Sequence, residues 1–295
     1  MEKHDYVRTD LAAESPVVEN GTSKLGVEAA RESDGPCSLL IVNVTSDEGA
    51  KAVGRPKGTY ITVSFQRPWL MSDGDLELTT DCLSRSIRRA APRVFDKPTP
   101  PSVLIAGLGN RYITSDAIGP LTLKSVNVTR HLKTHDKQLF SKLNTCSVSA
   151  ITPGVLGQTG IETFRLIKNA VDSVAPDLLI VIDALAAKSV DRLATTVQIC
   201  NTGIAPGSGI GNKRTAINRE TMGVPVIAIG VPTMVDSSTL VYDALEKAGV
   251  SEISKGLRAV LDNGKSFFVT LNDSDTAVLA LSDLISKALN KALAL

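Results

Sequence analysis

Two short, continuously apolar segments constrain the fold of this chain most strongly. Residues 103–106 read Val-Leu-Ile-Ala, and residues 178–182 read Leu-Leu-Ile-Val-Ile. Apolar runs without alternation are typical of strands buried on both faces of a parallel sheet. Because strands and helical patterns alternate from residue 103 onward, we predict an α/β fold of three αβα layers with a mostly parallel central sheet. The β-branched segments 38–44 and 59–65 add a smaller strand-containing N-terminal portion.

Each of these two buried strands leads into a carboxylate. Asp183 follows the second strand directly, and Asp116 follows the first after a glycine-containing turn. The carboxyl ends of parallel strands share one edge of the sheet, where ligands bind in open α/β folds, so we expect the two to meet. Either Thr114 or Ser115 is expected to cap a helix with Asp116 in its first turn. Taken alone, Asp183 also fits a simple cap of the next turn.

A pair of neighbouring carboxyl groups has a defined chemistry. Two carboxylates in contact do not both ionise easily, so one keeps a proton while the other is charged. Asp116 and Asp183 would then supply one acid and one base, which is enough to activate a water molecule against a peptide carbonyl. The residues themselves do not say which of the two is the base.

Composition and charge exclude several classes of protein. The chain has 295 residues, 43% of them hydrophobic, and a net charge of +1, so no global charge favours nucleic acid or a membrane surface. The longest apolar runs are shorter than a membrane span, and the polar first residues do not resemble a secretory signal. Four scattered cysteines without a CxxC pair fit reduced thiols, so we expect a cytoplasmic protein.

The remaining motifs do not indicate a cofactor or a metal. The Gly107-Leu108-Gly109 turn has Tyr112 where a dinucleotide site needs a third glycine. His131 and His135 lack the HExxH pattern of zinc peptidases. The glycine-rich loop 207–211 lacks the spacing of a phosphate-binding loop, although Lys213 and Arg214 beside it are candidates for binding an acidic substrate. A solvated basic turn or a subunit contact is the alternative for that pair.

Several motifs, in this order, resemble the germination protease family of spore-forming bacteria. The resemblance covers the N-terminal leader and most of residues 38–245; its motifs lie at residues 7–12, 48–60, 107–110, 115–120, 128–132, 153–157, 182–186, 203–214 and 223–233. It implies a fold similar to that of hydrogenase maturation proteases and a homotetramer. It also implies an aspartic-like endopeptidase, made as a self-processing zymogen, that begins the degradation of small acid-soluble spore proteins during germination. The corresponding location is the cytoplasm of the forespore or spore core, with no nucleic-acid or membrane partner.

The resemblance also assigns roles to residues. Its catalytic pair falls on Asp116 and Asp183, although Ser115 stands where the family is expected to have proline and Thr152 where a small residue is usual. The family's substrates carry Glu before the cut and Phe or Ile after it, which resembles Asp10-Leu11 in the leader. We therefore expect residues 1–10 to be a propeptide cut between Asp10 and Leu11, and residues 11–295 to form a single peptidase domain. The polar, weakly patterned residues 1–36 are expected to be extended or mobile.

Two other activities remain compatible with such a fold. One is a maturation-type peptidase that uses a metal between carboxylates, and the other is a phosphorylase-like enzyme that binds anions at its glycine loops. A chelator inactivates the metal-dependent enzyme and leaves a two-aspartate enzyme active.

Overall fold

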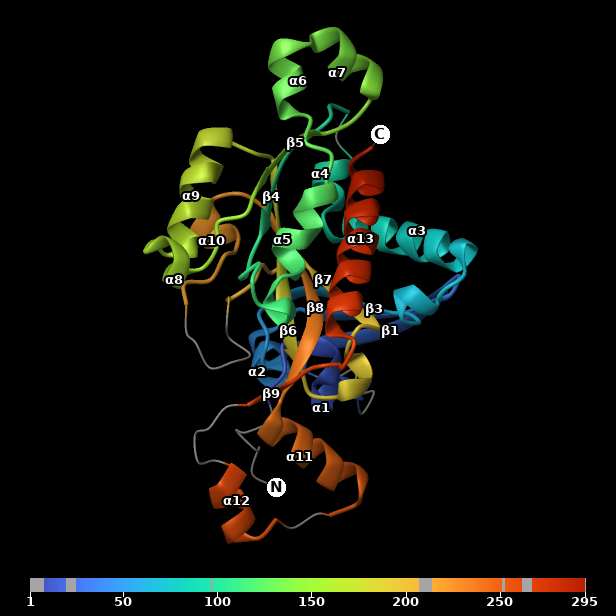
Figure 1. Ribbon diagram of the computed structural model, residues 1–295, viewed down its shortest axis with the longest axis vertical. Helices are drawn as coiled ribbons and strands as arrows, with labels where there is room; N and C mark the ends of the chain where they lie inside the picture. The colour runs from blue at the N-terminus through green and yellow to red at the C-terminus, as the bar shows by residue number, and fades with distance from the viewer. Residues whose placement is uncertain are drawn as a thin grey trace.

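A single mixed sheet organises the molecule. The computed structural model describes residues 8–19, 25–96, 98–206, 214–250, 253–261 and 267–294. Within these residues eight strands follow the order β1-β2-β3-β7-β8-β6-β4-β5, and a ninth, β9, pairs with β8. Helices cover both faces of this sheet (Figure 1), so the predicted three-layer α/β fold is confirmed.

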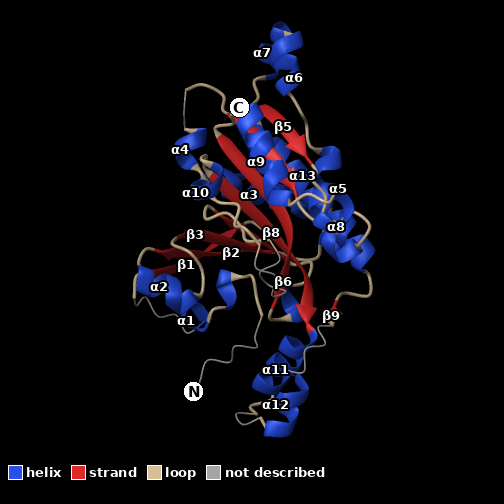
Figure 2. Ribbon diagram, turned by 90° about the vertical axis from the view of Figure 1, so that its left-hand side faces the viewer, coloured by secondary structure: helices blue, strands red, loops and turns tan. Residues whose placement is uncertain are grey.

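The sheet divides into a parallel and an antiparallel half. Parallel pairing joins β5 to β4, β4 to β6 and β6 to β8. The strands of this half are β4 (Ser102–Gly107), β5 (Ser147–Ile151), β6 (Leu178–Ala187) and β8 (Val226–Asp236). The other pairings are antiparallel; they involve β1 (Val27–Asp34), β2 (Cys37–Val44), β3 (Gly58–Ser64), β7 (Thr196–Cys200) and β9 (Phe268–Val269). The N-terminal strands therefore extend the central sheet instead of forming a separate one (Figure 2).

Alternating side chains of the buried strands feed two apolar layers. In β6, Leu178, Ile180 and Ile182 belong to the core on one face, whereas Leu179 and Val181 belong to the core on the other. The first core includes residues of α3 (Asp73–Ala90), α4 (Pro92–Phe95), α5 (Ile118–Thr122) and α13 (Ser274–Leu293). The second includes residues of α9 (Thr163–Val174) and α10 (Arg219–Met222). This two-sided burial is why the strand sequences contain apolar runs without alternation.

The other helices lie at the ends and edges of the sheet. In Figure 1, α6 (Arg130–His135) and α7 (Lys137–Leu143) lie at the top, and α11 (Ser237–Lys247) and α12 (Lys255–Leu261) at the bottom. The short helices are α1 (Pro16–Glu19), α2 (Asp47–Val53) and α8 (Leu156–Thr159), with 3-10 turns η1 (Ala12–Glu14), η2 (Pro68–Leu70), η3 (Thr114–Asp116), η4 (Leu123–Ser125) and η5 (Val190–Arg192). Among the described helices, none combines the length and the apolar character that crossing a bilayer requires.

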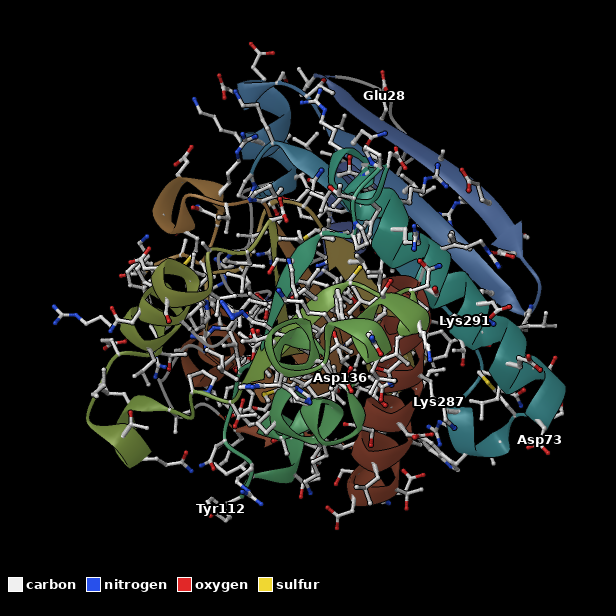
Figure 3. All side chains as sticks on the ribbon, turned by 90° about the horizontal axis from the view of Figure 1, so that it is seen from above. Glu28, Asp73, Tyr112, Asp136, Lys287 and Lys291 are labelled. Atoms are coloured by element: carbon white, nitrogen blue, oxygen red, sulfur yellow. The ribbon has the colours of Figure 1, made fainter. Side chains whose placement is uncertain are left out.

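The long helices α3 and α13 pack together on one face of the sheet. Lys291 of α13 forms an ion pair with Asp81 of α3, and Figure 3 shows the labelled Lys291 where these two helices meet. Arg88 of α3 donates to the carbonyl of Ala292 at 2.9 Å, which satisfies a carbonyl in the last turn of α13. The C-terminal helix is therefore an integral part of the first core.

The expectation that residues 1–36 are extended or mobile is wrong for most of the part described. Residues 27–34 form β1, in antiparallel register with β2 from Val27↔Val44 to Asp34↔Cys37. Leu11, Ala12, Ala13 and Val18 are buried. Strand β1 carries no alternating pattern because only Val27 is buried and the other residues are half or fully exposed. It is held by backbone pairing at the sheet edge, which hydrophobic periodicity does not report.

The close approach of α5 to the ends of β4 and β6 depends on glycine. Helix α5 crosses the ends of β4 and β6 so closely that a Cβ on Gly119 would lie 2.3 Å from the Leu108 carbonyl oxygen and 2.7 Å from that of Ile182. A Cβ on Gly107 would likewise lie 2.5 Å from the carbonyl oxygen of Gly119. Both neighbours are backbone, so the obstruction cannot be relieved by a side-chain rotation.

Gly119→Ala is therefore expected to lower the free energy of unfolding by about 1–3 kcal/mol, the range for overpacking a filled core. The matched control is Gly157→Ala in α8, where a Cβ meets nothing within 4 Å. Urea unfolding of both variants measures the difference. Equal stability of Gly119→Ala and the parent chain would contradict the close approach of α5.

Candidate active site

Asp116 lies at the end of a tight turn that follows β4. Its backbone N–H donates to the carbonyl of Ile113 at 2.8 Å, and its carboxylate accepts the N–H of Asn110 at 2.7 Å. Gly109 has a φ of 103°, and a Cβ there would lie 2.0 Å from the carbonyl oxygen of Asp116. The turn therefore folds back on itself, and the glycines serve this close packing. The hydroxyl of Thr233 in β8 anchors the turn by donating to the carbonyl of Ser115 at 2.6 Å.

The predicted helix cap at this turn is wrong. Thr114 and Ser115 lie inside the 3-10 turn η3, and Ile113 precedes it without a side-chain cap. Asp116 is the last residue of η3, and Ile118 is the first residue of α5. The carboxylate is thus held by the N–H of Asn110 within the turn, in place of the predicted position in the first turn of a capped helix.

Asp183 lies within β6, which continues to Ala187 and is longer than the predicted strand. It pairs in register with Gly230 of β8. Pairing with β4 ends one residue earlier, at Gly107↔Ile182. Asp183 is therefore the first residue of β6 beyond the end of β4, so the carboxyl-edge position predicted for it is correct. The longer strand results from β8, which keeps pairing with β6 past this edge.

The two carboxyl groups interact electrostatically. Asp183 is 7% exposed, and burial raises its pKa well above the ordinary value; the negative charge of Asp116 raises it further, although the Ala184 N–H, 3.0 Å away, opposes the shift. Burial also raises the pKa of Asp116, and the N–H of Asn110 counteracts this. The larger effect falls on Asp183, since it is the more deeply buried group. This arrangement favours a protonated Asp183 beside an ionised Asp116.

A cation faces the same pair. The positive charge of Arg214 lowers the pKa of both Asp116 and Asp183. Arg214 follows the glycine-rich loop, whose base is closed where Ile204 and Ile217 exchange backbone hydrogen bonds of 3.0 and 2.8 Å. Of the two basic residues predicted to bind substrate, the structure thus brings Arg214 to the carboxyl pair. Lys213 and the loop residues 207–211 lie outside the described residues.

The leader segment is bound along β6, three residues beyond Asp183. The N–H of Asp10 donates to the carbonyl of Ala186 at 2.8 Å, and the N–H of Ala186 donates to the Asp10 carboxylate at 3.0 Å. Gln198 of β7 holds both sides of the predicted cleavage point, because its Nε2 donates to the Asp10 carbonyl at 3.1 Å and its Oε1 accepts the Ala12 N–H at 2.8 Å. Leu11 is 1% exposed. The negative charge of Asp10 also raises the pKa of Asp183, which places the leader within electrostatic reach of the pair.

Sequence reasoning missed the residues that hold the leader. Gln198 is the polar residue of a buried strand that reads Thr-Val-Gln-Ile-Cys, and that contrast was an available signal. Ala186 acts only through its backbone, which no side-chain pattern reveals. Arg55 lies in a family motif, but nothing in its neighbours along the chain indicates the contact with Asp10.

Comparison with known proteins identifies the family of this chain. The sequence profile of the germination protease family, Peptidase_A25, matches residues 2–248. This chain belongs to the germination protease family. It is 45% identical to the germination protease of Caldanaerobacter subterraneus subsp. tengcongensis over 84% of this chain and 75% of that protein. It is 38% identical to those of Clostridium perfringens, over 91% of this chain and 81% of that one, and of Clostridium acetobutylicum, over 97% and 95%.

Membership of the germination protease family makes the chain a protease. Among solved structures, the NiFe hydrogenase maturation protease HycI from Thermococcus kodakarensis KOD1 aligns with a TM-score of 0.35 and 16% identity, over 67% of this chain and 98% of that one.

The raised pKa of Asp183 predicts a pH-dependent cost of folding. Below about pH 3.9 the unfolded and folded chains both hold this proton; as pH rises, the unfolded carboxyl ionises first, so stability falls until the folded carboxyl also ionises. Asp183→Asn removes this loss. Its stability relative to the parent chain is expected to increase by about 1.4 kcal/mol per pH unit across that window.

Urea unfolding of both proteins between pH 4 and pH 8 measures the effect. The control is Asp96→Asn, the same substitution at an exposed aspartate. A difference for Asp183→Asn that stays constant over this range would contradict the raised pKa.

Proposed function

We propose that this chain is an aspartic-like endopeptidase that begins the degradation of small acid-soluble spore proteins during spore germination. The observation that carries the proposal is the pairing of a buried carboxyl group, Asp183, with a second one, Asp116, at the carboxyl edge of the parallel strands. Membership of the germination protease family supports the same activity. The chain works in the cytoplasm of the spore core as a homotetramer, an assembly that rests on the family resemblance alone.

In the proposed mechanism the two carboxyl groups have different roles. Asp116 is the base, because it is the less buried group and accepts the Asn110 N–H. It takes a proton from a water molecule, whose oxygen bonds to the carbonyl carbon of the substrate. Asp183 is the acid: it protonates the carbonyl oxygen as the tetrahedral intermediate forms. When the C–N bond breaks, the amine nitrogen receives the proton held by Asp116, and the proton on the former carbonyl oxygen returns to Asp183.

Arg214 stabilises the charged form of this pair. A positive charge near two carboxyl groups favours one net negative charge on them, which keeps a base available below neutral pH. Arg214 and the preceding Lys213 also attract acidic segments of a substrate protein, which is the role predicted for them.

The leader makes the full-length chain a zymogen. Residues 8–12 bind beside the carboxyl pair, and the peptide bond between Asp10 and Leu11 is the bond cut during activation. While it is bound, the leader covers the edge of β6 that a substrate chain would need. Removal of residues 1–10 exposes this edge and leaves the 11–295 peptidase domain.

The catalytic roles predict the effect of removing either carboxylate. Asp116→Asn and Asp183→Asn are each expected to lower the rate of cleavage of a purified small acid-soluble spore protein by about 10²–10⁴-fold, the usual contribution of a positioned acid or base. Mass spectrometry of the products follows the reaction, with Asp96→Asn as the control. A folded Asp183→Asn protein that cleaves at the parent rate would contradict the catalytic role of Asp183. Loss of the parent chain's activity in EDTA would favour a metal-dependent peptidase.

We expect the substitution Arg214→Gln to shift the pH profile of kcat. Loss of the positive charge raises the pKa of both carboxyl groups, so both limbs of the kcat profile are expected to move to higher pH. Arg219→Gln, an exposed change on α10, is the control. A fall in kcat without any movement of the limbs would show that Arg214 does not act on the pair.

A further inference from the structure

The contacts that hold the leader involve its side chains as well as its backbone. Backbone contacts with Ala186 and Gln198 bind any extended segment, because they use only N–H and carbonyl groups of residues 10 and 12. Two further contacts depend on the side chains of residues 10 and 11. These contacts distinguish a leader of this sequence from others.

The first side-chain contact selects a carboxylate. One oxygen of Asp10 accepts the Ala186 N–H at 3.0 Å, and the other lies 3.6 Å from a guanidinium nitrogen of Arg55. The same guanidinium donates to the carbonyl of Thr9. The side chains of Asp10 and Arg55 are 11% and 23% exposed, so this ion pair is largely removed from solvent. An uncharged or basic side chain at position 10 would leave the half-buried Arg55 without this partner.

The second side-chain contact selects a bulky apolar residue. Leu11 lies in a cluster with Leu185, Ala187, Leu193 and Val235, where it is almost fully buried. This apolar contact and the carboxylate contact lie on either side of the bond between residues 10 and 11. The combination fits an acidic residue followed directly by a large apolar one.

Local structure fixes Arg55 in this position. Helix α2 ends at Val53, and Gly54, which follows it, has a left-handed φ of 72°. The N–H groups of Gly54 and Arg55 both donate to the carbonyl of Ala50, at 2.9 and 3.1 Å. Just beyond it, the hydroxyl of Tyr60 donates to the carbonyl of Pro56 at 2.7 Å. The backbone that carries Arg55 is thus tied at both ends, so the guanidinium is presented by a rigid support.

We propose that Arg55, together with the backbone N–H of Ala186, forms an acid-selecting subsite for the residue on the N-terminal side of the cleaved bond. It binds Asp10 in the zymogen and an acidic side chain of the substrate protein after activation. This inference rests on the proposed function, because it assigns specificity to the same peptidase site. Arg55 is a specificity residue here; the bond-breaking chemistry remains with the carboxyl pair.

Self-cleavage of the full chain tests the subsite. Asp10→Asn removes the charge at nearly constant size, Asp10→Glu keeps it, and Arg55→Gln removes its partner; Arg31→Gln, on the exposed edge strand β1, is the control. Asp10→Asn and Arg55→Gln are each expected to slow cleavage after residue 10 by about 10–100-fold. The double variant should be no slower than either single one, and Asp10→Glu should stay within a few-fold of the parent chain.

A second measurement uses the parent chain and Arg55→Gln after each has completed removal of its own leader, so that the leader no longer covers the site. Both proteins are given two peptides that differ only in Thr-Glu-Leu-Ala or Thr-Gln-Leu-Ala at the cleavage point. The parent chain is expected to favour the Glu peptide at least tenfold in kcat/KM, and Arg55→Gln should abolish the preference by slowing cleavage of the Glu peptide alone. Thermal unfolding confirms that the variants are folded.

The outcomes separate the two proposals. Equal cleavage of the Glu and Gln peptides by the parent chain, or a preference that survives Arg55→Gln, overturns the subsite and leaves the peptidase assignment intact. A parent chain that cuts neither its leader nor either peptide contradicts the proposed function, and the subsite with it.

Discussion

The close approach of the glycine turn to the end of β6 is the constraint on which the rest of the site depends. Gly107 and Gly119 let α5 cross the ends of β4 and β6 with backbone touching backbone, and Gly109 lets the turn fold onto Asp116. Asp183 reaches the same edge because β6 continues past the last residue paired with β4. Side chains at these glycines would push the turn outward and separate the two carboxyl groups.

Burial of the Asp183 carboxyl group lowers the stability of the fold and also raises the pKa of this group. A charged Asp183 at 7% exposure is unfavourable, so the group keeps its proton to a higher pH than an exposed aspartate does. The neighbouring Asp116 strengthens this effect, whereas Arg214 limits it. Asp10 of the leader adds a further negative charge that raises the pKa of Asp183, so the proposed removal of the leader would lower that pKa. Activation in this account therefore changes the electrostatics of the site as well as its accessibility.

The sequence predicted those features that local patterns encode. The two-sided burial of β4 and β6 produces continuous apolar runs, so the α/β class, the position of Asp183 and its meeting with Asp116 were all predictable. Strand β1 was missed because it buries only Val27 and depends on pairing with β2. The contacts of Arg55 and Gln198 with the leader join residues 46 and 188 positions apart, so only the folded chain brings them together.

The most direct test of the central claim is a carboxyl titration by ¹³C NMR on protein labelled at aspartate, with Asp116→Asn and Asp183→Asn used to assign the two signals. The account predicts that Asp183 remains protonated far above about pH 3.9, the value of an unperturbed aspartate, and that its titration moves to lower pH in Asp116→Asn. The account would be contradicted if both carboxyl signals titrated near that value and neither titration moved when the other aspartate was replaced by asparagine.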